Sequence, residues 1–115
     1  MASTYNITID QGATYTLAIA YKDSNGAAIN LTNYTAAMQL RSTYASTDAA
    51  LSLSSPSNGI VITGATGLIS ITITDTQTSA LSASAFVYDL EITSASNVKT
   101  RLIQGNATII PEVTR

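Results

Sequence analysis

The sequence predicts an all-β protein, a single antiparallel β-sandwich of immunoglobulin-like kind that occupies residues 1–115 as one domain. Apolar and polar residues alternate in about eight short segments, which is the period of strands with one buried face. Turn-forming residues separate these segments. No helical period is longer than two turns, so two packed sheets are the simplest way to bury the apolar faces. A small closed barrel is the main alternative.

In the first half of the chain, alternation predicts strands near residues 4–9, 15–21 and 34–41. A shorter strand is expected near residues 49–53, at the edge of a sheet. The segments between them are rich in turn formers, and Asn25-Gly26 favours a tight turn.

In the second half, strands are expected near residues 60–62 and 68–74, followed by a long hairpin and a last strand around Pro111. Pro111 lacks an N–H group, which suits a strand end or an edge position. The only plausible helix is short and lies near residues 75–81, with Asp75 placed to cap its N-terminus.

The hairpin spans residues 86–105 around the loop Ser-Ala-Ser-Asn at residues 94–97. Side chains two apart share a face of a strand, so one set in the first arm should point into the core. This set is apolar and comprises Phe86, Tyr88, Leu90 and Ile92.

Two registers of this hairpin keep the same residues inside. In the register that we favour, Thr93 pairs with Asn97, and Asp89 and Glu91 then face Arg101 and Lys99 as two opposite-charge pairs. Each such pair contributes about 0.2–1 kcal/mol, and exchanging Asp89 with Arg101 should restore most of the stability that either single change removes. A register shifted by two residues puts Leu90 opposite Leu102, and it places Asn97 in the left-handed position of a three-residue loop.

The composition excludes most catalytic chemistry. The chain has no cysteine and no histidine, so it lacks thiolate ligands, the commonest metal ligand and the commonest general base. Its serines have no evident activating base, and the calcium-loop-like segment from Asp23 to Asn30 lacks the closing acidic residue. We therefore expect no enzymatic activity, no metal site and no cofactor.

Charge and hydropathy also bear on partners. Only 10% of the residues are charged and the net charge is −2, with the five basic residues scattered, which argues against nucleic acid as a partner. No apolar run is long enough to span a membrane, and the N-terminus lacks the features of a signal peptide. We expect a chain made in a cytoplasm, with a Ser- and Thr-rich surface that suits a subunit packed against neighbours.

The candidate partner-contact residues come from the tyrosines and the two chain ends. Four of the six tyrosines lie on apolar strand faces and should be core, whereas Tyr5 and Tyr44 fall near segment ends. Residues 2–9 and 109–115 are the expected connectors, and removing either should leave the isolated core folded. The expected contact residues are Tyr5, Ile7, Tyr44, Ile109, Pro111, Val113 and Arg115.

Nearly the whole chain resembles a known family. The resemblance is carried, in this order, by DQGATYTLAIAYKDSNGAAINLTNYTAAMQLR, GLISITIT, TSALSAS, FVYDLEI and GNATIIPEVTR. These segments resemble small virion structural proteins of tailed bacteriophages, many of them phages of cyanobacteria. The family is similar to the immunoglobulin-like N-terminal domain of upper baseplate and fibre-adaptor proteins, and it brings no catalytic residues.

The resemblance implies a non-enzymatic structural subunit of the phage particle, a neck, tail or baseplate adaptor that joins virion components or fibres and is multimeric there. A capsid decoration protein is a second possibility that the sequence does not separate from the first, and a carbohydrate-binding adhesion module is a third. Two departures stand out: Tyr21 replaces a frequent tryptophan, and no fibre region follows Arg115. The expectation is a docking module without its own receptor-binding end.

Overall fold

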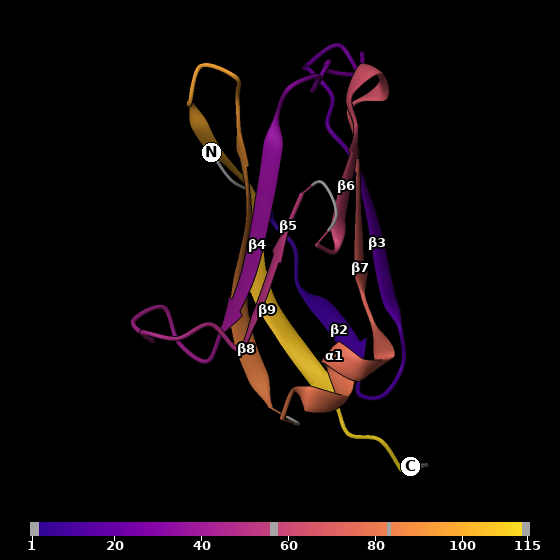
Figure 1. Cartoon of the computed structure of the whole chain (residues 1–115), viewed down its shortest axis with the longest axis vertical. Coiled ribbons are helices and arrows are strands. Elements are labelled where there is room, and N and C mark those ends of the chain that lie inside the picture. The colour runs from indigo at the N-terminus through magenta and orange to yellow at the C-terminus, as the bar shows by residue number, and fades with distance from the viewer. Residues whose placement is uncertain (1–2, 56–57, 83, 114–115) are drawn as a thin grey trace.

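A computed structural model describes residues 3–55, 58–82 and 84–113 of the chain. The described residues form two sheets and one short α-helix, so the predicted all-β class is confirmed (Figure 1). The elements are β1 (Ser3–Thr4), β2 (Ile7–Asp10), β3 (Tyr15–Ala20), β4 (Thr35–Arg41), β5 (Leu51–Ser54), β6 (Ile60–Thr63), the 3-10 turn η1 (Gly64–Thr66), β7 (Leu68–Ile73), α1 (Asp75–Ala80), β8 (Ala85–Thr93) and β9 (Lys99–Ile110).

The strand order is that of an immunoglobulin-like sandwich. The larger sheet has the order β1-β9-β8-β4-β5, with β2 also paired to β9, and the smaller sheet has the order β3-β7-β6. If β3, β6 and β7 are equated with immunoglobulin strands B, D and E, and β4, β8 and β9 with C, F and G, both layers have the immunoglobulin order. The first strands β1 and β2 pair with β9 instead of with the smaller sheet. Most pairs are antiparallel as expected, but β1 and β2 run parallel to β9.

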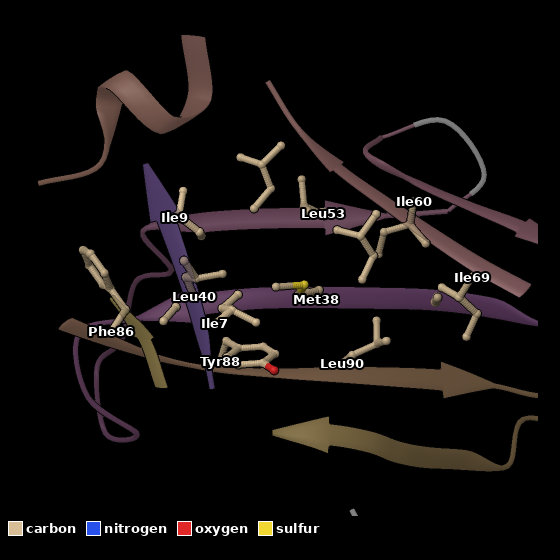
Figure 2. Packing of buried hydrophobic residues seen from close by; sticks show 14 of the residues in the cluster. Ile7, Ile9, Met38, Leu40, Leu53, Ile60, Ile69, Phe86, Tyr88 and Leu90 are labelled. Atoms are coloured by element: carbon tan, nitrogen blue, oxygen red, sulfur yellow. The ribbon is translucent and has the colours of Figure 1, made fainter. Parts of the chain in front are cut away.

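The core lies between the two sheets. In β4 and β8 every second residue is buried, which confirms the inward face predicted for β8. Side chains from β2, β4, β5, β6, β7 and β8 meet there, and Figure 2 shows Met38 and Leu53 close to Ile60 of the opposite sheet. Tyr88 is buried, and Tyr15, Tyr21 and Tyr34 are half-buried against the same cluster.

The hairpin does not have the register that we favoured. Thr93 pairs with Lys99 and Glu91 with Arg101, so the shifted register is correct next to the turn. Asn97 has a φ of 66° and occupies the left-handed position of the three-residue loop. The reason is local: an asparagine that tolerates this conformation allows a common hairpin loop, and this outweighs one additional surface charge pair.

A bulge between Leu90 and Glu91 then shifts the pairing by one residue. Leu90 consequently faces Ile103 rather than Leu102, and Asp89 faces Gln104. Asp89 and Arg101 still form an ion pair, because Arg101 Nε reaches Asp89 Oδ2 diagonally at 3.3 Å.

The helix is where the sequence predicts it, but Asp75 is not its N-cap. Thr74 is the cap: its hydroxyl accepts from the Gln77 N–H, and the Gln77 side chain accepts from the Thr74 N–H in return. Asp75 is already helical. This reciprocal capping box satisfies two donors, which a lone aspartate one residue later cannot do.

Candidate functional site

Two members of the predicted contact set are buried instead of exposed. Ile7 and Ile109 are 4% and 2% exposed and belong to the core. They lie in the paired strands β2 and β9, where Ile7 is opposite Ala107 and Ile9 is opposite Ile109. Both side chains therefore pack in the core, where they help to hold the chain's own N-terminal strand in the sandwich, and neither lies on the surface. The N-terminal segment from Ser3 to Asp10 is therefore a structural element rather than a free connector, and so is the C-terminal segment up to Ile110.

Tyr5 lies between β1 and β2, where the chain leaves strand geometry, and its side chain is 49% exposed. Its main chain is fixed on both sides, because its N–H donates to the Gln104 carbonyl at 2.8 Å and its carbonyl accepts from the Tyr88 hydroxyl. Gly105 permits this approach, since a Cβ there would lie 2.5 Å from the Tyr5 carbonyl oxygen.

The remaining predicted residues are separated from one another. β9 ends at Ile110, directly before Pro111 as its missing N–H requires, and Pro111 and Val113 are exposed beyond it. Arg115 lies outside the described residues. β1 lies beside Ile103 and Gln104 in the first half of β9, whereas Pro111 and Val113 follow the last residue of β9. The six members of the set that the structure describes therefore do not form one surface.

Tyr44 is the predicted residue that lies beside a concave surface. A groove of about 280 Å³ runs over the outer face of the larger sheet, and we call it the outer-sheet groove. Its lining residues are Gln39, Arg41, Tyr44, Val87, Tyr88, Asp89, Glu91, Arg101 and Gln104. They come from β4, β8, β9 and the turn that follows β4.

The turn that carries Tyr44 is held by a network of hydrogen bonds. The Ser46 N–H donates to the Thr43 carbonyl, and the Ser46 hydroxyl contacts the Thr43 and Ser42 hydroxyls. Arg41 donates to the Ser46 carbonyl at 2.9 Å and to Gln39 Oε1 at 2.7 Å, which ties the turn to β4. Tyr44, 78% exposed, is thus presented on a fixed support.

The groove gathers charge in a chain that has little of it. It is lined by two of the chain's five basic residues, Arg41 and Arg101, and by two of its seven acidic residues, Asp89 and Glu91. Arg101 is held between Asp89 and Gln104 Oε1, the latter at 3.2 Å. Planar donors and acceptors that are fixed in this way can form paired hydrogen bonds with a polar ligand at a small cost in side-chain entropy.

Sequence reasoning missed this groove although part of its signal was present. The alternation of β8 already puts Asp89 and Glu91 on its outward face. The pairing of β4 with β8, which sets Gln39 opposite Asp89, is a contact between segments about fifty residues apart. Nothing local in either segment specifies it.

Three tyrosines lie close together near the N-terminal strands. Burial raises the pKa of Tyr88 to about 12, and the nearby Tyr15 and Tyr5 hydroxyls add to the shift. Burial also raises the pKa of Tyr15, with a further contribution from Tyr5. The raised pKa values keep Tyr88 and Tyr15 protonated at neutral pH, and the Tyr88 hydroxyl donates to the Tyr5 carbonyl.

The calcium-loop-like segment forms an ordinary turn. Asp23 Oδ1 accepts from the N–H groups of Asn25 and Ala27, at 2.9 and 3.0 Å. Within the described residues, no three acidic side chains gather in a way that could hold a metal ion. Among the described residues, no helix has the length and apolar character that crossing a membrane requires; α1 has only six residues.

No protein-family model matches the chain, and no match to it was found among curated proteins.

Proposed function

We propose that this protein is a non-enzymatic structural subunit of a tailed-bacteriophage particle, an adaptor at the neck, tail or baseplate that docks to other virion proteins. The observation that carries the proposal is the strand order. The phage-like segments imply an immunoglobulin-like domain, and the two sheets have the order of that fold. A fold alone does not imply function, so the proposal also depends on the resemblance itself.

The surface supports the same role. With 10% charged residues, the exposed faces are coated mainly by serine, threonine, asparagine and alanine. Such a surface gives little charge repulsion between neighbouring subunits, and it offers backbone groups at the sheet edges for strand pairing.

The test is mass spectrometry of purified particles after heads and tails are separated. Recovery of the chain in the tail fraction is the expected result, and cross-linking would then name its neighbour. Recovery in the head fraction would assign it instead to capsid decoration. Its absence from both fractions would rule out a virion subunit.

A carbohydrate-binding adhesion module is a second candidate, and one observation favours it. Tyr44 presents an exposed aromatic ring beside the fixed planar side chains of the outer-sheet groove. A ring can pack on the apolar face of a sugar while arginine, aspartate and glutamine side chains bind its hydroxyl groups.

Glycan arrays followed by titration calorimetry test this candidate. Tyr44→Ala should weaken any binding at least about tenfold, because it removes the aromatic platform. Tyr5→Ala is the matched control, since Tyr5 is also exposed but lies outside the groove. Equal effects of the two substitutions, or no binding by the unmodified protein, would exclude the groove as a sugar site.

A further inference from the structure

The smaller sheet ends in an open edge at β3. β7 is its central strand, β6 lies on the other side, and within the described residues β3 pairs only with β7. β3 is the outermost strand on its side of the molecule (Figure 1). The edge of a sheet presents unpaired N–H and C=O groups that can pair with another strand.

The register identifies which backbone groups are free. β3 and β7 pair without interruption from Tyr15–Ile73 to Ala20–Leu68. The Tyr21 N–H donates to the Gly67 carbonyl at 2.8 Å, which continues this ladder and fixes its phase. Because hydrogen-bonded positions alternate along an antiparallel pair, the odd-numbered residues bond to β7. Thr16, Ala18 and Ala20 therefore direct their N–H and C=O groups outward.

The difference in side-chain burial between β7 and β3 also indicates that β3 can accept a further strand. Ile69, Ile71 and Ile73 of β7 are almost completely buried. The inward residues opposite them on β3 are only half-buried. A further strand beside β3 would complete the cover of these side chains, which are Tyr15, Leu17 and Ile19.

This edge lacks the features by which other proteins block strand pairing. From Gln11 to Tyr21 there is no charged residue and no proline, and the β3–β7 register contains no bulge. Of the other edge strands, β1 has two residues and β2, β5 and β6 have four each, and β2 carries Asp10. β3, with six residues, is the longest unprotected edge in the described part of the chain.

We propose that two copies of this chain pair antiparallel through β3 about a two-fold axis at Ala18, which joins the two smaller sheets into one continuous sheet. The free groups of Ala18 then bond to those of Ala18 in the second copy, and Thr16 bonds to Ala20. These three positions are the ones whose backbone groups point outward, so every outward pair on the edge is satisfied. The contact is isologous, as two-fold dimers require.

The side chains fit a second copy better than an arbitrary strand. In this register Leu17 lies opposite Ile19 of the second copy, and Tyr15 lies opposite Tyr21. Apolar residues thus meet apolar residues and an aromatic residue meets an aromatic residue, which are favourable cross-strand pairs. On the outer face the opposed residues are the small Thr16 and Ala20, and no charges meet. Dimerisation is a property of the purified chain and does not depend on whether the protein belongs to a phage particle.

Two double variants test the register. Thr16→Lys with Ala20→Lys puts lysine opposite lysine twice across the two-fold axis. Thr16→Lys with Ala20→Glu puts lysine opposite glutamate at the same two places. Both positions are exposed in the single chain, so either variant should fold, which circular dichroism checks. Sedimentation equilibrium then gives the dimer dissociation constant of each variant and of the unmodified protein.

The unmodified protein should dimerise, and the lysine–lysine variant should have a dissociation constant at least about tenfold higher than that of the lysine–glutamate variant. The amides of Thr16, Ala18 and Ala20 should also exchange hydrogen more slowly as protein concentration rises. A chain that stays monomeric up to about 1 mM would overturn the proposal. So would a dimer that both variants weaken equally, because it would form elsewhere.

Discussion

Thr78 shows how single polar residues join distant parts of this chain. It is fully buried, its hydroxyl accepts from the Gly12 N–H at 3.0 Å, and it donates to the Ala13 carbonyl at 2.9 Å. One side chain of α1 thereby satisfies the backbone of the connection between β2 and β3. Nothing in the sequence around Thr78 indicates that its side chain bonds to the backbone of this distant connection.

Replacing Thr78 should therefore be costly. Thr78→Val keeps the shape of the side chain but leaves the two backbone groups without a partner, and should lower the free energy of unfolding by about 1–3 kcal/mol. Thr78→Ser keeps the hydroxyl and is the control. Urea denaturation compares them, and a valine variant at least as stable as the serine variant would contradict the bonding described.

The raised pKa of Tyr88 gives a prediction for alkaline pH. Its pKa is about 12 in the folded protein and about 10 in the unfolded chain. The unfolded chain therefore releases the proton first, and the stabilisation that is fully present below pH 10 is lost as the pH rises from 10 to 12. The loss from this group should reach at most roughly 3 kcal/mol.

Denaturation at several alkaline pH values measures this slope. Tyr88→Phe removes the titrating group, so its stability should fall less steeply above pH 10, with a remainder from Tyr15, whose pKa is also raised. Phenolate absorbance should show one tyrosine fewer titrating at the highest pH. Parallel slopes for the two proteins would mean that Tyr88 is not the group responsible.

The predicted ion pair between Asp89 and Arg101 is present, although the hairpin register from which it was predicted is wrong. Its side chains are 37% and 50% exposed, so we expect a coupling energy of only about 0.2–1 kcal/mol. Exchanging the two residues is no longer expected to restore stability fully, because an aspartate at position 101 would face Glu91.

A double-mutant cycle with neutral replacements, Asp89→Asn and Arg101→Gln, avoids that clash and isolates the pair. High salt should reduce the coupling, since the pair is exposed. A cycle in which the two effects simply add would show that the contact does not stabilise the hairpin.

Among the secondary-structure elements, helix α1 depends on its capping box. Thr74→Ala removes the hydroxyl that accepts from the Gln77 N–H and should lower the free energy of unfolding by about 1 kcal/mol. Asp75→Asn, at the position first expected to cap, should cost less, because its carboxylate bonds only to the adjacent Thr76 N–H. Thermal or urea denaturation compares the free energies of unfolding of the two variants. A larger decrease for Asp75→Asn than for Thr74→Ala would contradict the assignment of Thr74 as the N-cap.

For the β8–β9 hairpin, the alternation of apolar and polar residues predicts the inward face of β8 but not the register of the two strands. Alternation correctly predicted which residues of β8 are inward, since that depends only on the strand period. The register depends on the loop conformation at Asn97 and on a bulge, and two registers with the same inward faces cannot be separated by alternation.

At the scale of the whole molecule, the N-terminal segment is part of the fold. A variant without residues 2–9 loses Ile7 and Ile9 from the core, each worth about 2–5 kcal/mol, which is comparable with the total stability of a small domain. We expect it to lose cooperative unfolding. Truncation after Ile110 removes only the exposed Pro111, Val113 and the residues around them, and should keep the fold.

Circular dichroism during urea denaturation compares the two truncations. Cooperative unfolding of the N-terminal truncation near the midpoint of the full chain would restore the view of this segment as a detachable connector. Loss of folding in the C-terminal truncation would show that the contact between Glu112 and Gln11 matters more than its single 3.1 Å hydrogen bond suggests.

The sequence by itself determined the all-β class, nearly every strand, the inward faces and the position of the one short helix, because these follow from period and local turn chemistry. Tertiary structure decided that Ile7 and Ile109 are core, that Tyr44 stands beside a charged groove, and that β3 is an open edge. Each of these is a property of pairing between strands distant in the sequence. The same alternating pattern is compatible with many strand orders, and only the packed sheets select one.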